Sequence, residues 1–211
     1  MCVGGQSCCL TTSWSGPWVI VAAPCARLHL VRGPVRNRGR GRPLNRSVRH
    51  MPGQTWFKQW ELEYDRDSTA SVYSGMTSSA GEACGCGDCL KWVQIRDVAF
   101  TPEVRRFFVK VGVDPTRETS IWGHMLREGE PSSYVFHGTY HFFGRLLVGP
   151  QSHIPMRGGK GYMIECLSVS PTLKIGLTSL TETCPDVPHE FRDVGVITIS
   201  FAYGALNEAY A

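Results

Sequence analysis

The sequence predicts an α+β domain in which an antiparallel sheet of about four to six strands packs against one or two helices. Helical periodicity is confined to the middle of the chain, near residues 90–112, whereas aromatic and β-branched segments dominate after residue 134. Glycine and proline separate these later segments. Helices grouped early and strands grouped late favour α+β over an alternating α/β arrangement.

The folded body, residues 51–211, is expected to begin with a strand. In the segment 55–64, apolar Trp60, Leu62 and Tyr64 alternate with two glutamates, and a period of two is typical of a half-buried strand. Residues 65–83 are rich in Ser, Thr, Gly and Ala. This composition predicts a loop, with a short strand around residues 72–73.

Two helices are expected next. The first is short and begins near residue 88, with apolar side chains at Leu90, Trp92, Val93 and Ile95. The second has clear ends, because Thr101 is a good N-cap, Pro102 suits the first helical position and Gly112 suits the C-terminal cap. Its apolar residues recur at i, i+3, i+4 and i+7: Val104, Phe107, Phe108 and Val111.

Four strands are predicted after these helices, over residues 134–143, 162–168, 173–179 and 194–203. The first of them has two different faces. Phe136, Tyr140 and Phe142 lie on one face, which is expected in the core, and His137, Thr139 and His141 lie on the other.

Charge divides the chain into two parts. Residues 1–50 contain eight arginines and no Asp, Glu or Lys, so the other 14 Lys and Arg face all 18 acidic residues and residues 51–211 carry a net charge of −4. The overall charge of +4 and the pI near 8.6 therefore arise from an Arg-rich head joined to an acidic body. They are no argument that the body binds nucleic acid or a membrane.

The head is expected to be disordered, because residues 32–49 have almost no apolar content. One interpretation is an over-long start, with translation beginning at Met51. Another is DNA association through residues 32–49, since the segment 40–43, Arg-Gly-Arg-Pro, resembles the core of an AT-hook. The apolar run at residues 17–23 is shorter than the ~20 residues of a membrane span, so no membrane association is predicted.

Three cysteines, Cys84, Cys86 and Cys89, lie within six residues, separated by two glycines that allow the backbone to curl. A structural zinc site needs four ligands, usually thiolates and imidazoles. The cluster predicts a zinc site in which these residues supply three ligands. The fourth would come from Cys184, which lies in a Thr-Cys-Pro segment, or from His137 or His141.

Other interpretations of the same residues stay open. Cys86 and Cys89 form a Cys-x-x-Cys pair at a helix start, which favours a reactive thiolate, although Asp88 between them would raise the thiol pKa. The cluster is also compatible with a turn that merely tolerates cysteine. His137 and His141 suit a metal or an acid–base pair, or else a solvated or hydrogen-bonded strand face. Cys166 is expected to point into the core.

The order of these motifs resembles a set of uncharacterised bacterial proteins. They share a Cys-x-Cys-x-x-Cys cluster like residues 84–89, a Gly-Ile-Asp-Pro-like turn matching residues 112–115, and a Tyr-His-Phe-x-Gly-like strand matching residues 140–144. The match covers roughly residues 84–203. The resemblance implies a shared fold and no activity, because no function is established for the set, and it assigns no catalytic residue here.

The function predicted from these observations is a non-enzymatic, zinc-stabilised module that binds a protein partner of unknown identity. Exposure of Trp122 and a mobile loop at residues 123–133 are expected to favour partner binding. Nine cysteines, clustered rather than spread, favour a reducing, cytoplasmic location. The alternatives are a thiol redox or metal-assisted enzyme that uses the cysteines and strand histidines, and DNA association through the head.

Overall fold

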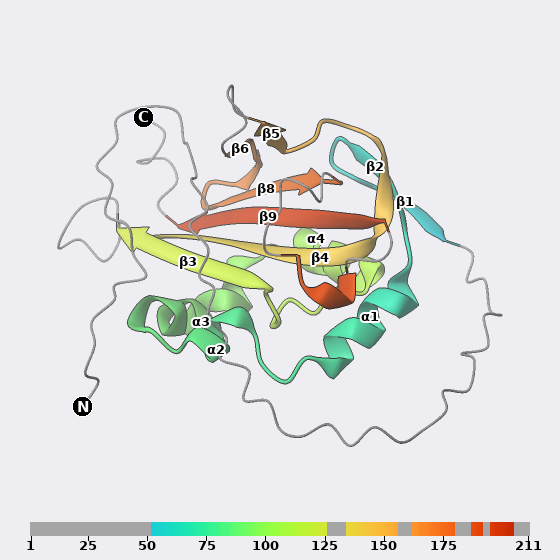
Figure 1. Ribbon diagram of the computed structural model, residues 1–211. Coiled ribbons are helices and arrows are strands. Elements are labelled where there is room, and N and C mark those ends of the chain that lie inside the picture. Colours follow the sequence, from blue (N-terminus) through green and yellow to red (C-terminus); the bar gives the residue numbers. More distant parts are fainter. Residues whose placement is uncertain (1–51, 126–133, 156–161, 180–186, 192–194, 205–211) are drawn as a thin grey trace, which may run out of the picture.

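The computed structural model describes residues 52–125, 134–155, 162–179, 187–191 and 195–204. The predicted Arg-rich head therefore lies outside the described residues. A seven-stranded antiparallel sheet packs against four α-helices, which confirms the α+β class (Figure 1). The strand order is β1-β2-β4-β9-β8-β7, and β3 pairs with β4 beside this path.

The strands of this sheet are β1 (Gly53–Phe57), β2 (Trp60–Tyr64), β3 (Ser120–Met125), β4 (Tyr134–Val148), β7 (Leu167–Ser170), β8 (Leu173–Thr178) and β9 (Val196–Gly204). A separate two-stranded ribbon contains β5 (His153–Pro155) and β6 (Tyr162–Ile164). The helices are α1 (Arg66–Gly75), α2 (Ala80–Cys84), α3 (Gly87–Ala99) and α4 (Pro102–Val111), with a short 3₁₀ helix, η3 (His189–Phe191). No helix in the described part of the chain is long and apolar enough to cross a membrane.

The predicted loop over residues 65–83 is wrong, because this segment contains α1 and α2. Local capping explains both helices despite their polar composition. The Asp65 carboxylate accepts a hydrogen bond from the Ser68 N–H at the start of α1. Ser79 and Glu82 form a reciprocal capping box at the start of α2. Only Thr69 and Tyr73 of α1 are buried, so its apolar pattern is weak.

The structure confirms the predicted ends of α4. Thr101 Oγ1 accepts the hydrogen bond of the Val104 N–H, and Gly112 ends the helix with a φ of +83°. A Cβ at Gly112 would lie 2.3 Å from the Arg66 carbonyl oxygen, so glycine is also required by the close packing of α1. The four apolar residues predicted for one face of the helix are all buried.

Two strand predictions need correction. The predicted strand over residues 162–168 is divided between β6 and β7. The break lies at Glu165 and Cys166, where the Glu165 N–H donates to the Ser152 carbonyl instead of to a sheet neighbour. The mobile loop predicted at residues 123–133 is wrong for residues 123–125, which belong to β3, and the rest of it lies outside the described residues. Strand β3 was missed because its residues gain their regular structure by pairing with β4.

The long strand β4 changes partners along its length. Its first half pairs with β3 and its last residues pair with β2. Side chains of α1 satisfy the backbone between these two segments. Tyr73 Oη donates to the His141 carbonyl at 3.0 Å and accepts from the His141 N–H at 3.1 Å, while Thr69 Oγ1 accepts from the Phe143 N–H at 3.0 Å. Helix α1 therefore takes the place of a strand at this edge.

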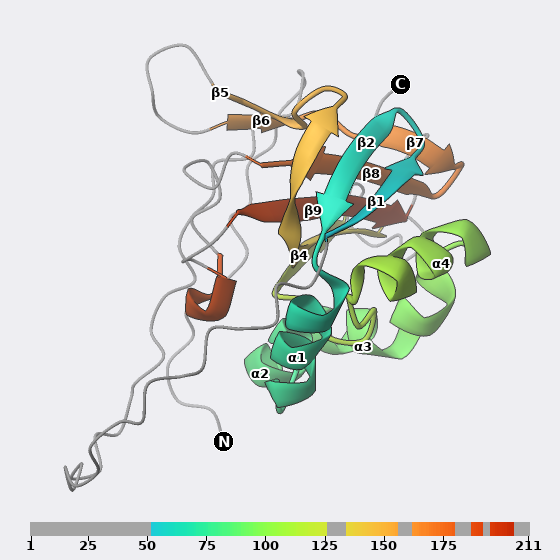
Figure 2. The ribbon, with the colours of Figure 1, turned by 90° about the vertical axis from the view of Figure 1, so that its right-hand side faces the viewer.

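The two faces of the sheet differ in chemistry. The four helices cover one face, and η3 lies on the other side (Figure 2). On the helix side, which we call the aromatic face, Trp92 of α3 packs against the rings of Phe100, Phe136 and Phe201. The opposite side, the polar face, contains the buried residues His137, Thr139, His141, Thr178, Thr198 and Ser200. The predicted division of residues 136–142 between core and opposite face is confirmed.

Candidate metal centre

The three cysteines predicted as metal ligands converge in the structure. The sulfur atoms of Cys84, Cys86 and Cys89 lie within 4.8 Å of one another. Cys84 is exposed, Cys86 is half-buried and Cys89 is buried, and all three are free thiols. The cysteine cluster therefore runs from the surface toward the interior at the junction of α2 and α3.

The local backbone explains this convergence. Cys84 is the last residue of α2, and Gly85 follows in the left-handed conformation with a φ of +64°. This turn reverses the chain so that Cys86 becomes the N-cap residue of α3 and Cys89 lies in its first turn. Cys89 Sγ is 4.0 Å from the Ile121 carbonyl oxygen, which places the inner end of the cluster against β3.

Ion pairs fix α2 against α3 and the residues before β3. Arg96 of α3 pairs with Glu82 at 2.8 Å and with Glu118 at 3.5 Å. Glu118 is fully buried and accepts a hydrogen bond from the Gly81 N–H at 3.0 Å. A Cβ at Gly81 would lie 2.9 Å from the Glu118 carboxylate, so only glycine allows this approach without a shift. These ion pairs and this hydrogen bond therefore hold together the two helices that carry the cysteine cluster.

The thiols have different electrostatic surroundings. Burial by itself raises the pKa of the Cys86 thiol, but the N–H of Cys89, the thiols of Cys89 and Cys84, and the N–H of Asp88 outweigh it, so the pKa lies below its usual value. Burial and the neighbouring thiols raise the pKa of Cys89. The Asp88 carboxylate, expected to oppose the thiolate, pairs with Lys91 Nζ at 3.3 Å.

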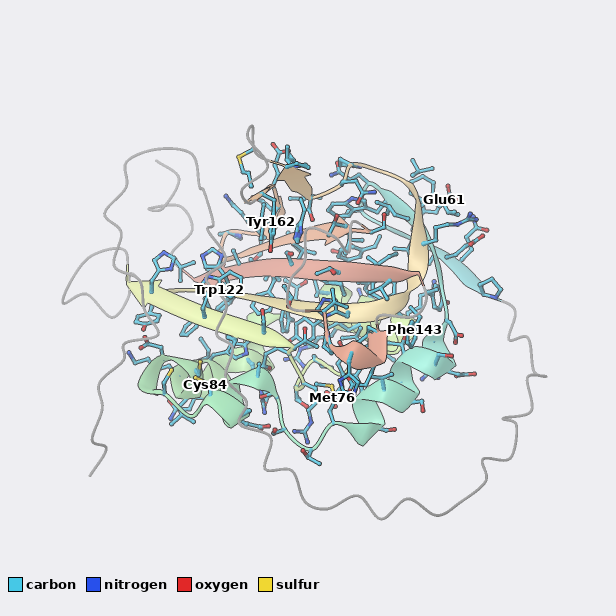
Figure 3. The ribbon with its side chains drawn as sticks, viewed as in Figure 1. Glu61, Met76, Cys84, Trp122, Phe143 and Tyr162 are labelled. Atoms are coloured by element: carbon cyan, nitrogen blue, oxygen red, sulfur yellow. The ribbon has the colours of Figure 1, made fainter. Side chains whose placement is uncertain are left out.

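The structure does not bring the two histidines predicted as fourth ligands, His137 and His141, to the cysteine cluster. Figure 3 shows Cys84 among the helices, apart from Trp122, whose ring stacks on His137. His137 and His141 belong to the polar face, whereas the cluster lies in the helical layer. Among the described residues, the group of closely spaced metal-binding side chains contains only the three cysteines. Cys184 lies outside the described residues, so its role stays a prediction.

The polar face, predicted to be solvated or hydrogen-bonded, is buried and hydrogen-bonded. The Thr119 hydroxyl lies within hydrogen-bond distance of the Thr139 carbonyl oxygen, at 2.9 Å, and of His141 Nδ1, at 2.8 Å. The Nε2 atom of His141 is buried without a hydrogen-bond partner among the described residues.

Both strand histidines are held neutral. Burial, reinforced by the neighbouring His153, lowers the pKa of His141 to about 3. Burial and the nearby His124 lower the pKa of His137 to about 3. The ring of His137 stacks on Trp122 at 5.5 Å and on His124 at 5.4 Å. Trp122 is therefore half-buried, which corrects its predicted exposure.

Several members of the polar face were missed by sequence reasoning. His153 Nε2 lies 2.8 Å from Ser200 Oγ, and the His153 ring stacks on Tyr162 at 4.4 Å. No local motif marks these residues, because β5, β6 and β9 meet only through the tertiary fold. Cys166, expected in the apolar core, instead directs its thiol at the Ser200 carbonyl, and burial raises its pKa to about 12.

Comparisons with known proteins found no matching family model, no matching curated protein and no matching solved structure. Any function is therefore inferred from the chemistry of the residues themselves.

Proposed function

We propose that the protein is a non-enzymatic interaction module whose helical layer is stabilised by a zinc ion held by Cys84, Cys86 and Cys89. The observation that supports this most directly is the convergence of three sulfurs within 4.8 Å. Zinc binds thiolate sulfur at about 2.3 Å, so two sulfurs in a tetrahedral site are about 3.8 Å apart. Movements of about 1 Å would therefore bring the cluster to bonding geometry.

A metal ion bound by the cysteine cluster would stabilise α2. Helix α2 has only five residues, fewer than a helix needs for stability by itself. An ion bound by Cys84 at the end of α2 and by Cys86 and Cys89 at the start of α3 would join the two helices. The N-terminal end of α3 also favours the negative charge of the thiolates.

Two features favour partner binding over catalysis. Leu90 and Val98 of α3 are 45% and 77% exposed, which places apolar side chains on the outside of the helix that begins at the cluster. Among the described residues, no histidine or carboxylate joins the three sulfurs as an acid or base. Free thiols and a thiolate-bound ion suit a reducing compartment, so we propose a cytoplasmic location.

Metal analysis of the purified full chain tests the proposal. We expect one zinc ion per chain, lost in Cys84→Ser, Cys86→Ser and Cys89→Ser. Cys166→Ser is the matched control, because it removes a free thiol outside the cluster and should keep the metal. A wild-type protein that stays metal-free after purification and after incubation with zinc would contradict the proposal.

Thiol redox chemistry is the second candidate. It is favoured by the position of Cys86 as the N-cap of α3, close to the buried Cys89 thiol. A Cys86–Cys89 disulfide would form with loss of two electrons and two protons to an external disulfide. Equilibration of the metal-free protein with glutathione buffers, followed by mass spectrometry, should then show reversible loss of two mass units. Unchanged free thiols throughout that range would eliminate this candidate.

DNA association through residues 32–49, and kinship with the bacterial proteins that share the cysteine cluster, remain predictions. The first concerns residues outside the described part of the chain. Steeply salt-dependent DNA binding by the full chain, absent after deletion of residues 1–50, would support it.

A further inference from the structure

The three sulfurs would leave one coordination position of a bound tetrahedral ion unfilled. This inference rests on the proposed zinc function. All three donors come from the six-residue segment 84–89. Three ligands from one short segment occupy one triangular face of a tetrahedral ion. The fourth position points away from that segment, so a second part of the molecule or an external molecule must fill it.

The exposure of the cysteines indicates where that position lies. Cys89 is buried against β3, Cys86 is half-buried and Cys84 is exposed. An ion in contact with all three sulfurs therefore lies near the surface, on the side of the exposed Cys84. None of the described histidines, cysteines or carboxylates completes the group, and the nearby Asp88 carboxylate faces Lys91.

The helices around the cluster are held together without a fourth protein ligand. Glu82, Arg96 and Glu118 connect α2, α3 and the residues before β3 by ion pairs. The left-handed Gly85 fixes the intervening turn. In closed structural sites the fourth ligand usually ties down a second segment, whereas here the second segment is already tied down by charge.

We infer that a metal ion bound at the cysteine cluster keeps one coordination position open to solvent, and that this position accepts a small external thiol. A thiol is the expected class because an ion selected by three thiolates is thiophilic. Binding replaces a bound water by a thiolate, and the thiol proton passes to solvent. The ion would then anchor an external molecule in addition to holding the helices.

The test uses the full chain loaded with Co²⁺, which reports its ligands through visible absorption, in the presence of a phosphine reductant. Addition of 2-mercaptoethanol should shift the d–d bands saturably and raise the sulfur-to-cobalt charge-transfer absorbance by about one third, as three thiolates become four. Cys166→Ser should respond like the wild type, because Cys166 lies outside the cluster.

Three outcomes would overturn the inference in distinguishable ways. A cobalt spectrum that is insensitive to 2-mercaptoethanol would mean a closed site. A Cys184→Ser variant whose cobalt spectrum has lost one sulfur ligand would identify Cys184 as the fourth donor. Either result leaves the proposed metal function intact. Failure of the wild type to bind Co²⁺ or Zn²⁺ would overturn the proposed function and this inference together.

Discussion

The aromatic face and the polar face of the sheet are both buried, but different interactions hold them together. On the aromatic face, Trp92 is fully buried and its ring lies within 5.9 Å of the rings of Phe100, Phe136 and Phe201. On the polar face, hydroxyl groups and imidazoles form hydrogen bonds between segments that are distant in the sequence. Apolar burial is non-directional, whereas each buried polar atom needs a partner, so the two faces should respond differently to substitution and to pH.

The largest expected effect is on the aromatic face. Trp92→Ala should lower the free energy of unfolding by about 3–5 kcal/mol, because it leaves a large cavity between α3 and the sheet. Chemical denaturation followed by fluorescence or circular dichroism measures this. Trp56 is 60% exposed, so Trp56→Ala is the control and should change stability by less than about 0.5 kcal/mol. Equal losses in both variants would contradict the assigned core.

Acid should destabilise the polar face selectively. The unfolded chain binds protons on its histidines below a pH of about 6.5, whereas folded His141 stays neutral until its pKa of about 3. The unfolded state therefore gains protons first, and stability falls as pH decreases through this window, by up to about 1.4 kcal/mol per pH unit for each such histidine.

The matched variant is His141→Gln, which cannot titrate. The slope of unfolding free energy against pH should be shallower in the variant than in the wild type between pH 6.5 and 5, by a difference that grows to about 1.4 kcal/mol per unit at the acid end. His141 is faced by His153 and Thr119, and by Phe191 of η3. Glu82, whose pKa is lowered to about 2 mainly by the Ser79 N–H, loses its contribution only below that window. Parallel slopes would show that His141 is not a buried neutral group.

The smallest expected effect concerns the contact between α1 and the backbone of β4. Tyr73→Phe removes the hydroxyl that serves both the N–H and the carbonyl of His141, and should cost about 1–2 kcal/mol. Equilibrium denaturation checks this value. Tyr64→Phe is a useful comparison, because Tyr64 is only partly buried, and it should cost less.

The elements that the sequence identified are those with strong local signals. Helix α4 combines an N-cap, a proline and a four-residue apolar face, and each signal was visible in the sequence. Helix α1 lacks such a face because only Thr69 and Tyr73 are buried, and its polar composition resembled a loop. The capping box at Ser79 and Glu82 was readable and would have predicted the start of α2.

Part of the candidate site could also be predicted from the sequence, and part could not. Convergence of Cys84, Cys86 and Cys89 could be predicted because six residues and two glycines limit the possible separations. The relation between this cluster and the strand histidines could not, because it depends on which face of β4 the helices cover. The network of Thr119, His153 and Ser200 joins segments distant in sequence, and only the assembled sheet brings them together.

Side chains of α1 take the place of a strand partner for part of β4. The docking of this helix is therefore linked to the solvent protection of backbone amides in the sheet. The backbone amides of His141 and Phe143 donate to hydroxyl oxygens of Tyr73 and Thr69 rather than to a neighbouring strand. Detachment of α1 would expose these two amides to solvent while the ladders of β4 with β3 and β9 stay closed. Their hydrogen–deuterium exchange therefore measures the docking equilibrium of a single helix from within the centre of the sheet.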